Sequence, residues 1–496
     1  MIAINYAELL ELAMPQVIVV ATALIVMAID LLLLRRQTTH VRFSVAATLA
    51  SLGCAGAVLR ILLVPVQANF LDGMLVADPL THLVQITLLV LTIFSLLTSA
   101  DSTFTEHVGE FVLLILVATA GMMFLVGSQD LLVIFISLEL LSLSLYILAA
   151  FDKRGGQSWE AALKYFLFGG MSAAFLLFGF SLLYGLSNST NLSGIAAAIH
   201  GPSLNPLLVI AIVTTAIGLG FKVAAAPFHF WAPDVYQGAP APGAAFIASG
   251  SKVASFFIFF QIMAIGFAGA EGSATLTHFV RGWVAVLALI AALSMVLGNL
   301  VAIRQTSLRR LLAYSAIAHA GYILLAIVAH TQQSLAALLY YVITYALTTL
   351  GAFGVVAVVE KQRGTDQLSN FDGLGRQAPV LSLCLSIFIL SLAGIPPLAG
   401  FFGKFYLFVT VLEAGSMGLL WLVVLAIAMS AVSLYYYLRV LKRIYVAVPA
   451  DGTLEMKSPM LNQVLMLLLA GAVVLLGCAP HLLLRWILSA VAASGL

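Results

Sequence analysis

The sequence has few charged residues. Only 8% of its 496 residues are Asp, Glu, Lys or Arg, whereas 62% are hydrophobic. An ordinary soluble chain has about 25% charged residues. This composition excludes a water-soluble globular protein and indicates an integral membrane protein. The 22 basic residues never gather into the stripe that phosphate binding requires, so a nucleic-acid partner is excluded as well.

Cysteine is also scarce. The three cysteines, Cys54, Cys384 and Cys478, lie far apart in apolar segments, and this spacing predicts neither a disulfide framework nor a metal site. The N-terminal stretch "MIAINYAELLELAMP" is acidic where a signal peptide is basic. The first apolar run is therefore expected to remain in the protein as a membrane span.

Long apolar runs, in contrast, are abundant. Runs of about 20 apolar residues can each cross the hydrocarbon core as a helix. The sequence contains fourteen of them and predicts an all-α polytopic membrane protein. The predicted spans are 12–34, 43–66, 79–99, 108–127, 129–151, 160–187, 204–236, 241–265, 279–302, 305–328, 334–359, 378–411, 416–444 and 461–485.

The charges of the loops predict the orientation of the chain. Cytoplasmic loops carry an excess of Lys and Arg, and an outer N-terminus places 15 basic residues inside and only Arg281 and Arg485 outside. An even number of spans then puts the C-terminus outside as well. The basic residues expected inside are Arg35, Arg36, Arg42, Lys153, Arg154, Arg304, Arg309, Arg310, Lys361, Arg363, Arg376, Arg439, Lys442, Arg443 and Lys457.

Two predicted spans are unusually long, and prolines interrupt both: "KVAAAPFHFWAP" in the seventh and "LAGIPPLAGFFGKF" in the twelfth. Proline removes a backbone donor and clashes with the preceding turn, so each span should consist of two half-helices. Each is the fourth helix of a block of five, and an odd block length gives the second block the opposite orientation. Inverted repeats with paired broken helices are typical of ion-coupled transporters. The predicted organisation is three spans in 1–107, one repeat in 108–265, the inverted repeat in 279–444 and a last span in 461–496.

Four charged residues lie deep within these spans: Glu139, Lys222, Lys252 and Lys404. A lone charge at such depth costs roughly 2.5 to 3.5 kcal/mol on insertion scales, so each should face a partner or water. Lys222 lies near the first break, where the carbonyl end of a half-helix favours a cation. Lys404 follows the second break, near the positive end of the next half-helix, which should favour proton release. These positions predict an ion path, although buried pairs that only brace the helices are the alternative.

Other polar residues in the spans have simpler explanations. Arg60 is expected to extend its charge to the membrane surface, and Lys164 lies close enough to the inner end of its span to be either structural or functional. His229 and His319 are candidates for the ion path, although a histidine in an apolar bundle is often only hydrogen-bonded core. Asp234 closes the seventh span and is explained as a helix cap.

The motifs resemble a known family. The stretches "LGFKVAAAPFHFWAPDVYQGAPAP", "SLELLSLSLYIL", "RLLAYSAIAHAGY" and "SLAGIPPLAGFFGKFY" closely resemble subunit N of bacterial NADH-quinone oxidoreductase, an antiporter-like subunit family of respiratory complex I. Sister subunits L and M and the multisubunit sodium/proton antiporters share the broken helices and the core of "PFHFW". The continuation "PDVYQGAP" and a lysine at position 404 resemble subunit N, because subunit M has an acid there.

The resemblance implies a proton-pumping subunit in a bacterial inner membrane, with no cofactor of its own. NADH, FMN, iron–sulfur clusters and quinone would be bound by other subunits, and its neighbours would be subunit M, the small membrane subunits and lipid. By resemblance, Glu139, Lys164, Lys222, Lys252 and Lys404 are the proton-translocation residues. His229 and His319 would belong to the polar axis that connects them.

Two alternatives are compatible with the residues. A subunit of a multisubunit sodium/proton antiporter would have the same fold, and would differ by not co-purifying with a flavin and iron–sulfur enzyme. A structural spacer would use the buried charges only to hold neighbouring subunits together. Transport by variants in which these charges are neutralised would distinguish the spacer from the two transporters.

The predicted topology can be tested by cysteine labelling from outside. In a background that lacks the three native cysteines, cysteines at positions 154, 363 and 451 should be protected from an impermeant thiol reagent, whereas a cysteine at position 190 should react. Labelling at position 363 without labelling at position 190 would contradict both the orientation and the inverted repeat.

Overall fold

The computed structural model describes residues 6–153, 155–199, 205–276, 278–414, 418–448 and 459–495. Arg154 and Lys457, two of the basic residues expected inside, lie outside these ranges. So do residues 204 and 416, with which two predicted spans begin, and position 451 of the labelling test.

Most of the described chain is helical, as predicted. Twelve of the described helices are long and apolar enough to cross a membrane. They are α2 (Met14–Leu32), α3 (Thr39–Leu63), α4 (Pro79–Ser99), α5 (Val108–Val126), α6 (Leu131–Ala149), α7 (Gly156–Ser187), α11 (Ala241–Gln261, continued by the π-helical turn Ile262–Gly266), α12 (Trp283–Ala302), α13 (Leu308–Ala329), α14 (Gln332–Arg363), α18 (Leu420–Tyr445) and α19 (Met460–Cys478).

Both predicted helix breaks are present. The seventh predicted span is divided into α9 (Pro206–Lys222) and α10 (Trp231–Gly238), and the twelfth into α16 (Pro379–Ala393) and α17 (Ala399–Ala414). The twelve long helices and these two interrupted ones occupy the positions of the predicted spans. The inversion of the two five-helix blocks, and the domain boundaries drawn from it, stay predictions.

Several elements were not anticipated from the sequence. The last predicted span, 461–485, is longer than the helix at its position, because α19 ends at Cys478. α20 (His481–Ser494) follows as a separate helix, since Pro480 cannot continue the hydrogen-bond pattern of α19. The other short elements are α1 (Tyr6–Leu12), the hairpin β1 (Ala68–Phe70) and β2 (Leu75–Ala77), α8 (Leu192–Ala198), the hairpin β3 (Ser273–Ala274) and β4 (Phe279–Val280), the 3₁₀ helix Leu368–Phe371 and α15 (Leu374–Gln377).

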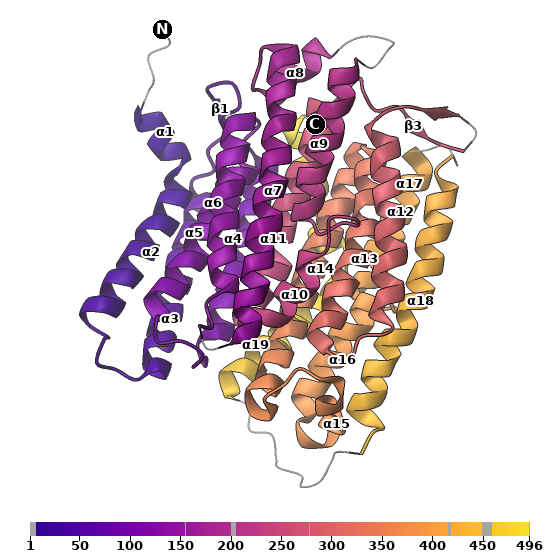
Figure 1. The fold of residues 1–496 in the computed structure, drawn as a ribbon. Coiled ribbons are helices and arrows are strands. Elements are labelled where there is room, and N and C mark those ends of the chain that lie inside the picture. Colours follow the sequence, from indigo (N-terminus) through magenta and orange to yellow (C-terminus); the bar gives the residue numbers. More distant parts are fainter. Residues whose placement is uncertain are drawn as a thin grey trace.

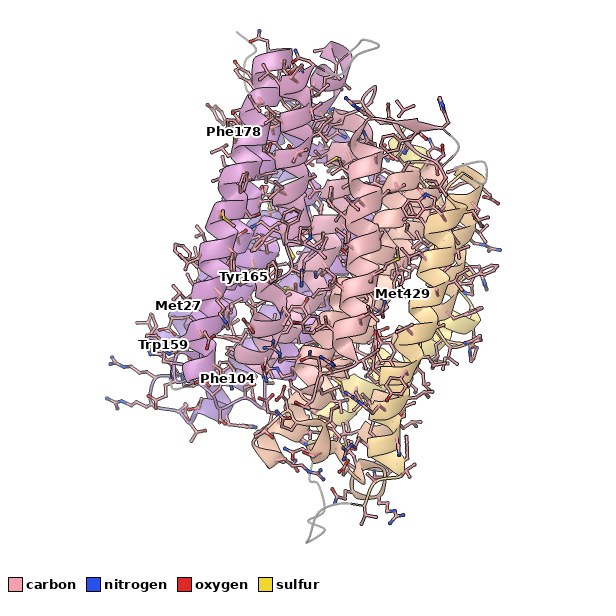
Figure 2. All side chains as sticks on the ribbon, turned by 45° about the vertical axis from the view of Figure 1, so that its right-hand side comes forward. Met27, Phe104, Trp159, Tyr165, Phe178 and Met429 are labelled. Carbon is pink, nitrogen blue, oxygen red and sulfur yellow. The ribbon has the colours of Figure 1, made fainter. Side chains whose placement is uncertain are left out.

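The helices form one upright bundle (Figure 1). α1 begins and α20 ends toward the upper end in this view, whereas the α2–α3 loop and α15 lie at the lower end. Apolar side chains cover the sides of the bundle: Trp159 and Phe178 on α7 are 62% and 52% exposed and point outward in Figure 2. Tyr165 on the same helix is buried among its neighbours. The exposed sides are suited to lipid or to other membrane subunits.

Glycine allows α12 and α13 to approach closely. A Cβ atom added to Gly298 would lie 2.5 Å from the backbone nitrogen of Ala318, and one added to Gly321 would lie 2.7 Å from the carbonyl oxygen of Ala291. Small residues at such contacts let two backbones meet inside a membrane, where helix packing has little hydrophobic driving force. The close pairing of α12 and α13 fixes the position of His319 on α13.

A buried ion pair joins the N-terminal helices. Asp30 of α2 is fully buried, and its two carboxylate oxygens accept hydrogen bonds from Nε and Nη2 of Arg42 on α3, at 2.8 and 2.6 Å. The backbone N–H of Gly109, at the start of α5, donates to Asp30 Oδ2 at 2.9 Å. One carboxylate therefore connects three helices. The sequence shows Arg42 only as a loop charge, because its partner Asp30 lies on a different helix.

Asp30→Ala is expected to lower the free energy of unfolding by about 3 kcal/mol, because it leaves the Arg42 guanidinium without its partner in a poorly hydrated place. Asp30→Ala combined with Arg42→Ala should cost less than the single change. Thermal unfolding of the detergent-purified protein measures both. A double variant less stable than Asp30→Ala would contradict the importance of the pair.

Candidate functional site

The backbone of the first break is held by side chains from neighbouring helices. The N–H of Ala226 donates to Ser294 Oγ of α12 at 2.8 Å, and Trp231 Nε1 donates to the carbonyl of Phe221 at 2.9 Å. Ser172 of α7 donates to the carbonyl of Gly218 at 3.1 Å. Irregular backbone is tolerated at membrane depth only where protein or water satisfies it. The backbone groups at and next to the break are therefore satisfied by the protein itself.

Lys222, the last residue of α9, is buried beside this break, with 8% of its surface exposed. Its Nζ donates to Ser142 Oγ on α6 and lies 5.9 Å from the centre of the Tyr146 ring. Glu139, one turn before Ser142, is half-buried and close enough to act on Lys222 electrostatically. In this structure, Lys222 is thus bound to a hydroxyl next to Glu139 and forms no ion pair with the described carboxylates.

Glu139 also faces the edge of an apolar surface. Leu132, Ile136 and Leu143 on the same side of α6 are each at least half exposed. A carboxylate at the edge of such a surface is costly in lipid, which favours a protein neighbour or water there.

Lys252 of α11 reaches the same break from another helix. It is 1% exposed, and its Nζ donates to the carbonyl of Val223, the C-terminal cap of α9, while lying 5.9 Å from the centre of the Trp231 ring. The end of α9 attracts a cation, as the sequence predicts, but the lysine that bonds its carbonyl is Lys252 and not Lys222. The amine of Lys252 therefore bonds the residue that follows Lys222 in the chain, whereas the amine of Lys222 bonds Ser142.

Lys404 occupies the matching place at the second break. Its Nζ donates to the carbonyls of Leu392 and Ala393 at 3.0 and 3.2 Å and to Ser430 Oγ at 2.9 Å. Gly394 makes this approach possible, because its φ of +83° suits glycine and a Cβ there would lie 3.1 Å from Lys404 Cδ.

The structure adds a contact of Lys404 that the expected dipole effect did not include. Lys404 is in the second turn of α17. Its side chain extends backwards across the break, and its amine lies against the carbonyl end of the preceding half-helix, α16. The expected influence of the positive end of α17 on proton release stays a prediction.

His319 lies in a cluster of buried hydroxyls beside Lys404. Its Nδ1 is 2.8 Å from the Tyr341 hydroxyl and its Nε2 is 3.3 Å from the Tyr437 hydroxyl, which in turn contacts Ser315 Oγ at 2.5 Å. Tyr322 packs edge-on against the His319 ring at 5.7 Å, and Lys404 Nζ lies 5.2 Å from the centre of the Tyr322 ring. The structure brings His319 and Lys404 together around one tyrosine.

His229 is placed differently from His319. It lies in the segment between α9 and α10, where its ring stacks on Phe230 at 4.7 Å. Its Nδ1 is buried and has no hydrogen-bond partner among the described residues. The structure does not connect His229 to His319 by a hydrogen bond within the described chain.

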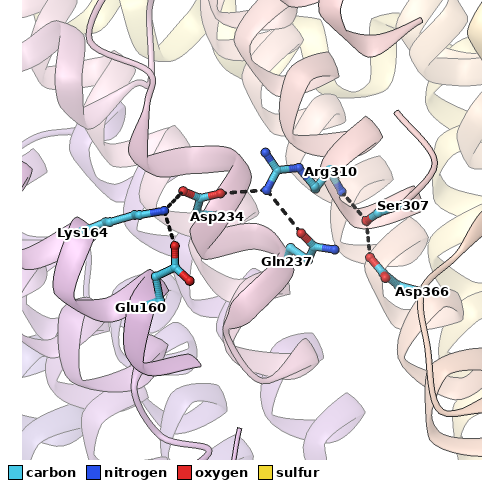
Figure 3. Close-up of polar contacts among 7 residues, drawn as sticks. All are labelled: Glu160, Lys164, Asp234, Gln237, Ser307, Arg310 and Asp366. Atoms are coloured by element: carbon cyan, nitrogen blue, oxygen red, sulfur yellow. Dashed lines mark hydrogen bonds and ion pairs between the residues drawn. The ribbon is translucent and has the colours of Figure 1, made fainter. Parts of the chain in front are cut away.

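Lys164 belongs to a network of polar side chains that links α7, α10 and α13 (Figure 3). Its Nζ is 2.5 Å from Glu160 Oε1 and 2.7 Å from Asp234 Oδ2. The other oxygen of Asp234 is 2.7 Å from Arg310 Nη1, which also contacts Gln237 at 3.3 Å. Asp234 lies in the first turn of α10 and is no cap. It ties that half-helix to α7 and α13.

Arg309 holds the other end of α10. It is 3% exposed, and its guanidinium donates to the carbonyls of Tyr236 and Ala239 and to Glu360 of α14. Both Arg309 and Arg310 are in the first turn of α13. The sequence shows both only as loop charges, and no local pattern predicts their partners on α10.

Other residues of the site were missed as well. Ser142 was detectable, because it follows Glu139 by three positions and shares its helix face. Tyr341 and Tyr437 were not, because they reach His319 from α14 and α18, far away in sequence. Among the described residues, His, Cys, Asp and Glu form no group of three that could hold a metal ion.

Together, these features define a polytopic helical membrane protein with buried lysines at two helix breaks. Residues 128–430 match the family model described as NADH:quinone oxidoreductase/Mrp antiporter, transmembrane. The chain is 54% identical to "NADH-quinone oxidoreductase subunit N 2" of Acidobacterium capsulatum, covering 98% of this chain and 99% of that protein. The chain therefore belongs to the NADH:quinone oxidoreductase/Mrp antiporter family of membrane subunits.

Solved structures agree with this assignment. A chain of respiratory complex I from Thermus thermophilus with bound aureothin superposes with a TM-score of 0.78 at 34% identity, covering 95% of this chain and 98% of that chain. A chain of the Mrp complex from Dietzia sp. superposes with a TM-score of 0.80 at 20% identity, covering 97% of both chains. The second similarity shows a shared fold alone.

Proposed function

We propose that this chain is the subunit N type of proton-translocating subunit in the membrane arm of an NADH-quinone oxidoreductase. Its similarity over nearly full length to a protein with that name supports the subunit type. The proton-translocation residues are Glu139, Lys164, Lys222, Lys252 and Lys404, with His229 and His319 on the connecting axis. The chemistry of NADH, FMN, iron–sulfur clusters and quinone belongs to partner subunits, and this chain uses the energy released.

The observation that carries the proposal is the bonding of the three deep lysines. Lys222, Lys252 and Lys404 are each at most 8% exposed, and in the described residues their amines bond only neutral oxygens. A bracing residue would be paired with a carboxylate, since an unpaired buried charge costs several kcal/mol. Amines held by neutral oxygens can gain or lose a proton without breaking a permanent ion pair. This argues against a purely structural spacer.

The arrangement suggests an order of transfer. Lys222 takes up a proton from the inner side, with Glu139 biasing its affinity from the next turn of α6. Lys252 bonds the adjacent carbonyl and receives the proton laterally. His319 and then Lys404 pass it toward the outer side, because they share the cluster around Tyr322. Lys164 acts at the inner end, where it holds α10 through Asp234.

The surroundings follow from the same assignment. The half-buried Glu139 beside exposed leucines supports contact with another membrane subunit, for which we propose subunit M or one of the small membrane subunits. Lipid covers the other apolar sides. The protein is placed in a bacterial inner membrane with both termini outside, and residues 108–265 and 279–444 are proposed to be the inverted repeats.

A sodium/proton antiporter subunit is less favoured, because the Mrp similarity is at only 20% identity.

Lys222→Ala is expected to abolish most proton translocation by the complex while assembly is retained, because removing a buried amine relieves its desolvation cost. Glu139→Ala should impair translocation more than Glu139→Asp, which keeps a carboxylate near the amine. Proton uptake by vesicles with equal enzyme content measures the effect. Equal translocation by wild type and Lys222→Ala would exclude the proposed role.

Lys404→Arg is expected to block turnover while it retains charge and most packing, because arginine does not deprotonate in proteins. Lys404→Glu should restore part of the activity if a titratable group is sufficient. NADH-driven proton pumping in proteoliposomes compares these variants with wild type. If Lys404→Arg pumps normally, Lys404 is only a cap for the α16 carbonyls and the outward path uses another group.

A further inference from the structure

The proposed path contains a gap between Lys252 and His319. Lys252 Nζ contacts the Val223 carbonyl and the Trp231 ring, whereas the nitrogens of His319 contact the hydroxyls of Tyr341 and Tyr437. Within the described chain, no hydrogen bond joins the two groups. A proton that moves between them needs oxygen atoms in the intervening space.

Tyr236 extends from the first break toward this space. It lies on α10, is fully buried, and packs edge-on against Trp231 with the ring centres 6.3 Å apart. On another side it packs edge-on against Phe353 of α14 at 5.6 Å. Tyr236 therefore connects the aromatic ring beneath Lys252 with α14.

α14 presents a polar surface to Tyr236. Tyr345, Thr349 and Phe353 are spaced by four residues and share one face of this helix. The ring of Tyr345 lies 5.1 Å from that of His319, and its phenol is close enough to that of Tyr236 for an electrostatic interaction. The face thus runs from the Tyr236 contact to His319.

Two buried hydroxyls near this contact have unused hydrogen-bonding capacity. Tyr236 Oη forms no hydrogen bond with any described group, and the interaction of Thr349 Oγ1 is with the phenol of Tyr345. An unpaired buried hydroxyl costs about 1 to 3 kcal/mol, so such groups are nearly always paired with protein or ordered water. A cavity of about 10 Å³ lined by His319, Tyr345 and Thr348 continues from Tyr345, and this is room for about one water molecule.

We propose that Tyr236, Tyr345 and Thr349 form a water-binding junction that carries protons between Lys252 and His319. The inference rests on the proposed function. In each transfer a phenol oxygen accepts one proton while its own O–H proton passes to the next oxygen, so the tyrosine is unchanged and one proton moves. Water fills the spaces between hydroxyls, and Tyr236 and Thr349 position it.

The test uses Tyr236→Phe and Thr349→Val in the complete complex, because both changes remove a hydroxyl and keep the packing shape. Each should slow NADH-driven proton translocation by at least about tenfold, as expected for loss of a proton-transfer group. The H₂O/D₂O isotope effect on the rate should rise, because proton transfer becomes limiting. A structural role would not raise it.

Tyr340→Phe is the matched control. Tyr340 is also a buried tyrosine of α14, but its hydroxyl donates to the Leu476 carbonyl at 2.7 Å, away from the junction. This variant should keep wild-type translocation and isotope effect. If Tyr236→Phe and Thr349→Val behave like Tyr340→Phe, the junction is refuted.

Lys252→Ala distinguishes a failure of the junction from a failure of the proposed proton translocation. If Lys252→Ala loses translocation and both hydroxyl variants are normal, only the junction is wrong. If Lys252→Ala itself translocates normally, the proposed function fails, and the junction fails with it. A rate loss in Tyr236→Phe with an unchanged isotope effect also overturns the junction and assigns the residue a structural role.

Discussion

At the two helix breaks, backbone carbonyl groups lose the N–H partners that an unbroken helix would give them. Hydrocarbon cannot satisfy them, so the protein must. At the first break Lys252 bonds the Val223 carbonyl, and at the second break Lys404 bonds those of Leu392 and Ala393. At each break, the free carbonyls therefore bind the amine of a buried lysine. The helix interruption and the buried charge are two parts of one arrangement.

This arrangement explains the unusual surroundings of the lysines. A carboxylate next to each amine would stabilise the charge but would also hold it permanently. The protein instead surrounds the amines with carbonyls, serine hydroxyls and aromatic rings, such as Ser142 for Lys222 and Ser430 for Lys404. Such partners accept a cation or a neutral amine at moderate cost. Glu139 remains one turn away from Ser142, where it can act through its field.

The short half-helix α10 links the two regions of the site. It is held by Lys164 and Arg310 through Asp234, and Arg309 bonds the carbonyl of Tyr236. Its other residues place Trp231 under Lys252 and Tyr236 against α14. Because the partners of α10 come from α7, α13 and α14, its position depends on helices on both sides of the bundle.

From the sequence it could be predicted that the chain lies in a membrane, where its spans lie and where two of them break. These features depend on the length of apolar runs and on the positions of prolines, which are local properties of the chain. The sequence also identified the deep lysines, since a charge in an apolar run is visible without knowing its neighbours. Tertiary structure decided what each charge touches. Lys404 bonds the half-helix before its own, and Asp234 is a bridge between helices instead of a cap. The partners of His319 lie up to 118 positions away, and such contacts are set by how the helices pack, which no local pattern records.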